Sequence, residues 1–122
     1  MTALLVVLGA AVGAPLRYLT DLLVQSRHRT ALPWGTFTVN AAGSLVLGAV
    51  AGAVAHGAPG WLLTAVGTGF CGALTTFSTF GFETVRLAEE GSVREAFLNV
   101  TLSLVVGFLA CIGGWELAAT LV

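Results

Sequence analysis

The sequence contains no lysine, and only 9% of its 122 residues are charged. Soluble domains average about 25% charged residues, so this chain has too little charge to cover a water-exposed surface. Five arginines and a formal net charge of −1 provide no basic patch, and we expect no nucleic-acid partner. With 57% hydrophobic residues and a mean hydropathy of +0.95, the composition predicts a membrane protein. The length fits one domain, residues 1–122.

Cysteine is also scarce, which argues against a disulfide framework. Cys71 and Cys111 both lie in apolar segments, so we expect reduced packing residues and no metal or disulfide pair. The apolar start of the chain lacks the basic residues that open a cleaved signal peptide, and none is expected. The sequence contains no serine–histidine–acid set, metal-binding cluster or phosphate-binding loop. We therefore expect a conduit rather than an enzyme.

Four apolar stretches are long enough to cross a bilayer, which takes about 20 helical residues. They cover approximately residues 2–24, 33–55, 61–86 and 96–121. Polar or glycine-rich loops separate them. The sequence therefore predicts an all-α membrane protein with four transmembrane helices, surrounded by lipid.

The third stretch differs from an ordinary lipid-facing helix. The segment Gly57–Phe82 carries no charge, yet it contains four hydroxyl side chains within five positions: Thr75, Thr76, Ser78 and Thr79. Polar groups are costly near the middle of a bilayer. We expect this helix to break near Gly72 to Thr75. The freed carbonyls would then need partners inside the protein, in a water-filled cavity or on an ion.

Small and polar residues recur every four positions in the neighbouring stretches, which places them on one helix face. The second stretch has Thr36, Asn40 and Ser44 in this spacing, and the fourth has Asn99, Ser103, Gly107 and Cys111. Such a stripe is typical of close helix packing or of a polar track. Both interpretations stay open from spacing alone.

The residue types around these stripes suit a small anion. The Asn40 amide and the hydroxyls are hydrogen-bond donors, and the edges of the Phe77 and Phe80 rings are electropositive. Aromatic pairs at this spacing are usually core packing, but these two adjoin the hydroxyl cluster. Arg17 is either an interfacial arginine or an anion-attracting group at a pore vestibule. Carbonyls at the break would suit one fixed cation.

Three motifs carry a resemblance to a known family. They are Gly13–Tyr18, Gly35–Ser44 and Gly69–Phe80, of which the last is long and highly specific. Over nearly its full length the sequence resembles the CrcB/Fluc fluoride channels, four-span proteins of bacteria. The resemblance implies passive fluoride export across the cell (plasma) membrane. It also implies an antiparallel, dual-topology-type dimer with two pores and a central sodium ion that is bound but not transported.

The resemblance also implies roles for individual residues. Backbone carbonyls of Gly72 and Thr75 would hold sodium, and the Phe77 and Phe80 rings would face fluoride. The other path-lining positions would be Asn40, Thr36, Ser78, Thr79 and Glu83, with Asn99 and Ser103 on the fourth helix. The family often has a tyrosine and serines on that helix, and here Gly107 lacks a hydroxyl.

The distribution of arginine between the two ends of the predicted bundle indicates which dimer partner the chain requires. All five arginines fall on the side of the first and third loops: Arg17, Arg27, Arg29, Arg86 and Arg94. Basic residues in short loops stay inside, so both termini are expected outside. An antiparallel dimer then requires a partner of opposite bias, which favours a heterodimer over a dual-topology homodimer.

Two other functions are compatible with a four-span chain. A small proton-coupled multidrug exporter would need an embedded carboxylate in its first span, where this chain has only Asp21 near the end. A non-conducting packing subunit would use its glycines only to bring helices together. Proton dependence of efflux, or no ion flux at all, would identify these alternatives.

Overall fold

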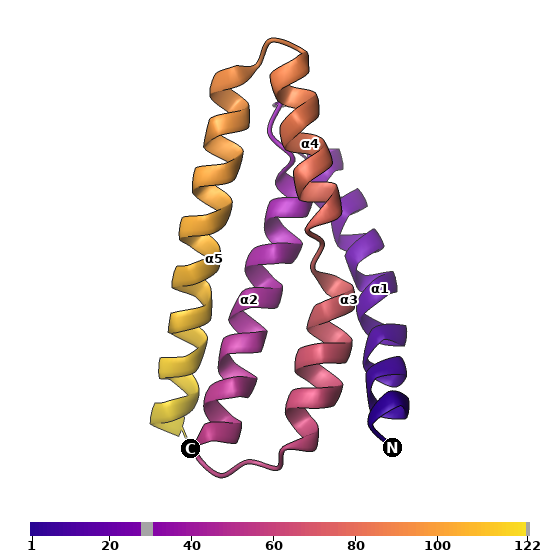
Figure 1. The fold of residues 1–122 in the computed structure, drawn as a ribbon, viewed down its shortest axis with the longest axis vertical. Helices are drawn as coiled ribbons and strands as arrows, with labels where there is room; N and C mark the ends of the chain where they lie inside the picture. The colour runs from indigo at the N-terminus through magenta and orange to yellow at the C-terminus, as the bar shows by residue number, and fades with distance from the viewer. Residues whose placement is uncertain (28–30, 122) are drawn as a thin grey trace.

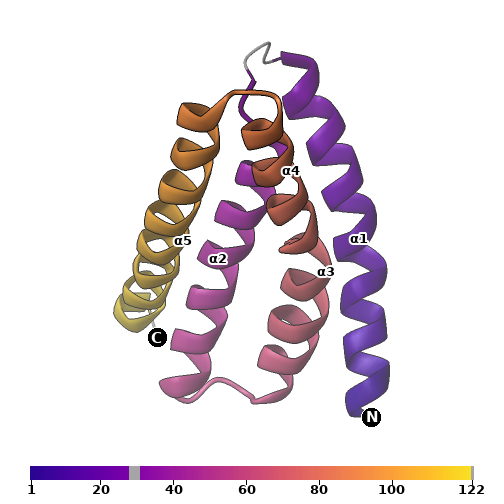
Figure 2. The ribbon, with the colours of Figure 1, turned by 45° about the horizontal axis from the view of Figure 1, so that its top comes forward.

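The computed structural model describes residues 1–27 and 31–121 and shows a bundle of helices (Figure 1). Arg29, one of the arginines in the predicted charge bias, lies outside the described residues. Both chain termini lie at one end of the bundle, and the α4–α5 connection lies at the other (Figures 1 and 2). The elements in chain order are α1 (Thr2–Arg27), α2 (Trp34–Ala55), η1 (Leu63–Cys71), α3 (Gly72–Leu74), α4 (Ser78–Glu89) and α5 (Val93–Leu121).

Within the described ranges, three helices are long and apolar enough to cross a membrane: α1, α2 and α5. Residues 61–86, expected as one span, are divided among η1, α3 and α4. Helix α1 continues to Arg27 and α5 begins at Val93, beyond the apolar stretches used to place the boundaries. Backbone hydrogen bonding continues into polar residues where the hydrophobic pattern ends, so these helices are longer than their apolar parts.

The helical conformation is interrupted at residues 75–77, between α3 and α4. Gly72 is helical, with φ −61° and ψ −35°, whereas Thr75 is extended, with φ −82° and ψ 161°. A threonine, not the glycine, is therefore the first residue to leave the helix. The preceding segment η1 is π-helical, and the Gly72 N–H donates to the Gly67 carbonyl five residues back. Such π-helical turns are frequent at functional sites.

Glycines set the distances between the helices. Helix α2 packs most extensively against α5, and α1 against η1. A Cβ atom added at Gly48 would overlap the Cys111 carbonyl oxygen, and one at Gly9 would overlap the Ala65 carbonyl oxygen. These backbones touch only because the side chains are absent, which is the usual packing of membrane helices. Cys71 and Cys111 are free cysteines.

Substitution of Gly48 by alanine should destabilise the α2–α5 interface. The added methyl overlaps the Cys111 carbonyl, and such overpacking costs about 1–3 kcal/mol. Thermal unfolding of purified protein in detergent measures the effect. Gly113→Ala on α5 is the matched control, because an added Cβ there meets nothing within 4 Å. Equal melting temperatures for the two variants would show that the α2–α5 backbone contact is not close.

Candidate functional site

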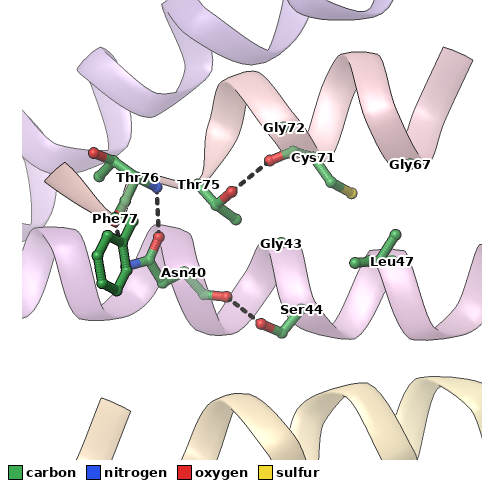
Figure 3. Close-up of a pocket in the computed structure, with 10 residues that line it drawn as sticks. All are labelled: Asn40, Gly43, Ser44, Leu47, Gly67, Cys71, Gly72, Thr75, Thr76 and Phe77. Carbon is green, nitrogen blue, oxygen red and sulfur yellow. Dashed lines mark hydrogen bonds between the residues drawn. The ribbon is translucent and has the colours of Figure 1, made fainter. Parts of the chain in front are cut away.

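The interruption is joined to α2 by one side chain. Asn40 Nδ2 donates to the Thr76 carbonyl at 3.0 Å, and the Thr76 N–H donates to Asn40 Oδ1 at 2.7 Å (Figure 3). Both backbone polar groups of Thr76 are therefore satisfied by a single amide. We call this pair of hydrogen bonds the Asn40–Thr76 clasp. It restrains a non-helical residue against a rigid helix, although the two residues lie 36 positions apart.

The Thr76 side chain begins the next helix. Its Oγ1 accepts the Thr79 N–H at 3.2 Å and donates to Thr79 Oγ1 at 3.0 Å. Ser78 Oγ lies 3.5 Å away. An N–H in the first turn of a helix has no partner within the helix, and a threonine hydroxyl commonly caps it. Thr76 was not among the predicted site residues, although threonine three positions before the bonded N–H is a capping signal.

These bonds leave two carbonyls without helical partners. In an uninterrupted α-helix the Thr76 N–H would bond to the Gly72 carbonyl, and the Thr79 N–H to the Thr75 carbonyl. Both N–H groups instead bond to side-chain oxygens. Among the residues that the structure describes, no donor bonds to the Gly72 or the Thr75 carbonyl oxygen. The Thr75 hydroxyl donates to the Cys71 carbonyl at 2.8 Å, so it does not compete for these two oxygens.

Two cavities meet at Thr76. The larger, about 300 Å³, is shown in Figure 3. It brings together the predicted residues Asn40, Gly72, Thr75 and Phe77, with Gly43, Ser44, Leu47, Gly67, Cys71 and Thr76. The smaller, about 140 Å³, is lined by the predicted residues Arg17, Thr36 and Thr79, with Tyr18, Asp21, Val39 and Thr76. The Asn40–Thr76 clasp therefore lies at the residue that both cavities share.

The two predicted aromatic rings meet at the start of α4. The ring centroids of Phe77 and Phe80 are 5.8 Å apart, with the planes tilted by 45°. Phe80 is half-buried, whereas 83% of Phe77 is exposed in the single chain. One ring is thus held against the bundle, and the other projects from the interruption.

Two other predicted residues carry buried polar atoms without partners. Glu83 Oε1 and Ser103 Oγ have no hydrogen-bond partner among the described residues. Glu83 has Thr36, Asp21 and Arg86 as its polar neighbours. Ser103 lines a third cavity, of about 290 Å³, together with Ser44, Leu104, Gly107, Phe108 and Cys111. Buried polar atoms are normally paired, so these two atoms are exceptions among the described residues.

Asn99 lies apart from these three cavities. It is only 4% exposed, and its Nδ2 donates to Thr84 Oγ1 at 2.8 Å. Thr84 Oγ1 in turn donates to the Phe80 carbonyl at 2.8 Å. In this structure Asn99 joins α5 to α4 through Thr84, one helical turn from the half-buried Phe80.

Comparison with known proteins identifies the family. The family model described as CrcB-like protein, Camphor Resistance (CrcB), matches residues 4–115. This chain belongs to the CrcB family. A relative in Frankia casuarinae named "Fluoride-specific ion channel FluC 1" is 56% identical over 97% of this chain and 96% of its own length. A relative of the same name in Streptomyces avermitilis is 51% identical over 93% of both chains. One of the same name in Nocardia farcinica is 58% identical over 82% of this chain and 68% of its own length.

CrcB membership and the three long apolar helices place the chain in the membrane. Its bacterial relatives are named as ion channels, and helices α1, α2 and α5 each suffice to cross a bilayer. The chain is a multi-pass protein of the cell membrane.

Removal of the Asn40 amide should make the non-helical backbone at residues 75–77 more mobile. Asn40→Leu leaves the Thr76 N–H and carbonyl without their partners, at a cost of about 1–3 kcal/mol for each buried group. Hydrogen exchange of a peptide covering residues 72–80 should become faster, as measured by mass spectrometry. Ser44→Ala is the control, because its hydroxyl bonds only to the Asn40 carbonyl within α2. Unchanged exchange in Asn40→Leu would mean that the clasp does not hold the segment.

Proposed function

We propose that this chain is a subunit of a fluoride-selective channel that passively exports fluoride and lowers its concentration in the cell. The observation that carries this proposal is the 56% identity, over nearly the whole of both chains, to a relative named as a fluoride-specific ion channel. The site is consistent with it, since amide and hydroxyl side chains line both cavities. It contains no catalytic arrangement among the described residues, and the proposed activity is conduction, not an enzyme reaction.

The proposed path follows the cavities. An anion attracted by Arg17 enters the smaller cavity, past Thr36 and Thr79. It then passes Thr76 and the Phe77 ring into the larger cavity. Amide and hydroxyl groups along this path would exchange their present acceptors for the anion, and ring edges add a positive potential. The Ser103 and Ser78 hydroxyls are further donors near the path, whereas the Glu83 carboxylate lines it as an acceptor when ionised. A small anion that accepts strong hydrogen bonds gains most from such a lining.

We further propose that the carbonyls of Gly72 and Thr75 hold a structural sodium ion. The support is that no described residue donates a hydrogen bond to either oxygen, since an unpaired carbonyl in a membrane interior is costly. Hard cations prefer oxygen ligands, so two such carbonyls suit sodium. When bound, the ion supplies a fixed positive charge beside the path. Two oxygens do not complete its coordination, and we propose that a partner chain contributes further oxygens.

That other chain is proposed to be an antiparallel partner covering the interruption. The larger cavity and the 83% exposed Phe77 ring lie at a broken span, and lipid cannot satisfy the backbone there. The described arginines at helix ends, Arg27, Arg86 and Arg94, lie opposite the termini. This bias favours a partner that inserts the other way. An active dimer of this chain alone, with termini accessible on both sides of the membrane, would instead establish a dual-topology homodimer.

Proteoliposomes containing the complete channel should release fluoride much faster than chloride. The reason is that chloride is larger and accepts weaker hydrogen bonds, so the donors compensate less of its lost hydration. Ion-selective electrodes measure both rates in the same vesicles. Similar efflux of the two anions would contradict the proposal. Efflux that depends on a proton gradient would identify an exporter, and absence of any flux would identify a packing subunit.

A ring substitution tests the path within the same experiment. Phe80→Ile keeps the bulk of the side chain but removes the ring edge, so fluoride efflux should fall at least about tenfold, the order of one lost polar contact. Phe97→Ile is the control, since Phe97 on α5 is 71% exposed and is not among the predicted path residues. If Phe80→Ile conducts like Phe97→Ile, then Phe80 only packs.

A further inference from the structure

We propose that Thr76 is a positioning residue, whose hydroxyl keeps the Thr75 carbonyl available to a cation. The inference deepens the proposed function and rests on its cation site. It concerns the side chain of Thr76, in addition to the backbone groups held by Asn40. The availability of the Thr75 carbonyl is set by the acceptor that the Thr79 N–H takes.

The Thr79 N–H has two acceptors close to it in the chain. One is the Thr75 carbonyl, four residues back, which is the partner that an α-helix would use. The other is Thr76 Oγ1, which it takes at 3.2 Å. The Thr76 hydroxyl hydrogen points to Thr79 Oγ1 at 3.0 Å, which leaves a lone pair facing the N–H. The hydroxyl therefore competes directly with the Thr75 carbonyl for this donor.

Loss of the hydroxyl would change the start of α4. The Thr79 N–H would then lack a partner in the first helical turn, where caps are most needed. The acceptor that an α-helix would supply is the Thr75 carbonyl, once Thr75 rotates from its extended conformation, with ψ 161°, to a helical one. The Thr75 carbonyl and the Thr76 N–H belong to one peptide group, so this rotation would also draw the Thr76 N–H away from Asn40. Helix α4 would grow backward, and the Thr75 carbonyl would point along the helix axis instead of toward a cation.

Asn40 and the Thr76 hydroxyl act on different carbonyls. Asn40 Oδ1 takes the Thr76 N–H and thereby frees the Gly72 carbonyl. Thr76 Oγ1 takes the Thr79 N–H and thereby frees the Thr75 carbonyl. Removal of the hydroxyl deletes no atom of the clasp, since the clasp uses only the backbone of Thr76. The contribution of the hydroxyl is therefore measured with Asn40 left in place.

The test measures sodium-dependent stability of the purified dimer. Unfolding temperatures are recorded in detergent while sodium chloride replaces N-methylglucamine chloride at constant ionic strength. Wild type and Thr76→Ser, which retains the hydroxyl, should show the same sodium midpoint. Thr76→Val should raise that midpoint about tenfold, the order expected for one hydrogen bond. Thr120→Val is the control, because it removes an exposed hydroxyl bonded only within α5.

The possible results separate this inference from the function on which it rests. An unchanged midpoint in Thr76→Val, or an equal shift in Thr76→Ser, overturns the role of the hydroxyl. If Thr76→Val does not fold, Thr76→Ala removes the hydroxyl with a smaller side chain. An unchanged sodium midpoint in Thr76→Ala then overturns the role of the hydroxyl in the same way. If the wild type shows no sodium dependence, the cation site and this inference both fail. Fluoride efflux of the same preparation then reports separately on the channel.

Discussion

A backbone inside a membrane must satisfy its own polar groups, and the interruption at residues 75–77 is built around this constraint. The N–H groups of Thr76 and Thr79 are satisfied by an amide oxygen and a hydroxyl, both side-chain acceptors. The Thr76 carbonyl is satisfied by the Asn40 amide. Because these side chains replace helical carbonyls as acceptors, the Gly72 and Thr75 carbonyls lose the N–H donors that a continuous helix would supply. Among the residues that the structure describes, no donor bonds to these two oxygens, while the adjacent N–H groups are paired.

Close helix packing holds this arrangement in place. The clasp works only if α2 approaches the interruption closely, and a Cβ added at Gly43 would overlap the Thr75 side chain. On the other side, Gly13 of α1 allows its helix to touch the Phe70 carbonyl of η1. The small-residue stripes therefore do not compete with a polar function. They bring the polar side chains within hydrogen-bond distance of the interrupted backbone.

Sequence patterns predict the parts of this structure that depend on neighbours in the chain. The apolar stretches and the hydroxyl cluster at residues 75–79 are local features, and both are visible in composition. The Asn40–Thr76 clasp joins residues 36 positions apart, and one sequence contains no signal for that pairing. Four-residue spacing placed Thr36 and Asn40 on one face, but they line different cavities because Thr76 lies between. The four-residue spacing on α5 likewise does not show that Asn99 bonds to Thr84 of α4. The π-helical form of η1 also has no signature in the local sequence.

The most direct test of the central claim is an experimental density map of the assembled dimer in sodium. A compact density is expected at the interruption, bound at about 2.3–2.6 Å, the range of hard-cation ligands, by the Gly72 and Thr75 carbonyl oxygens of this chain and by oxygens of its partner. That density should weaken when a large organic cation replaces sodium. Contradictory results would be water-like density at hydrogen-bond distances, or Gly72 and Thr75 carbonyls paired with backbone N–H groups in a continuous helix.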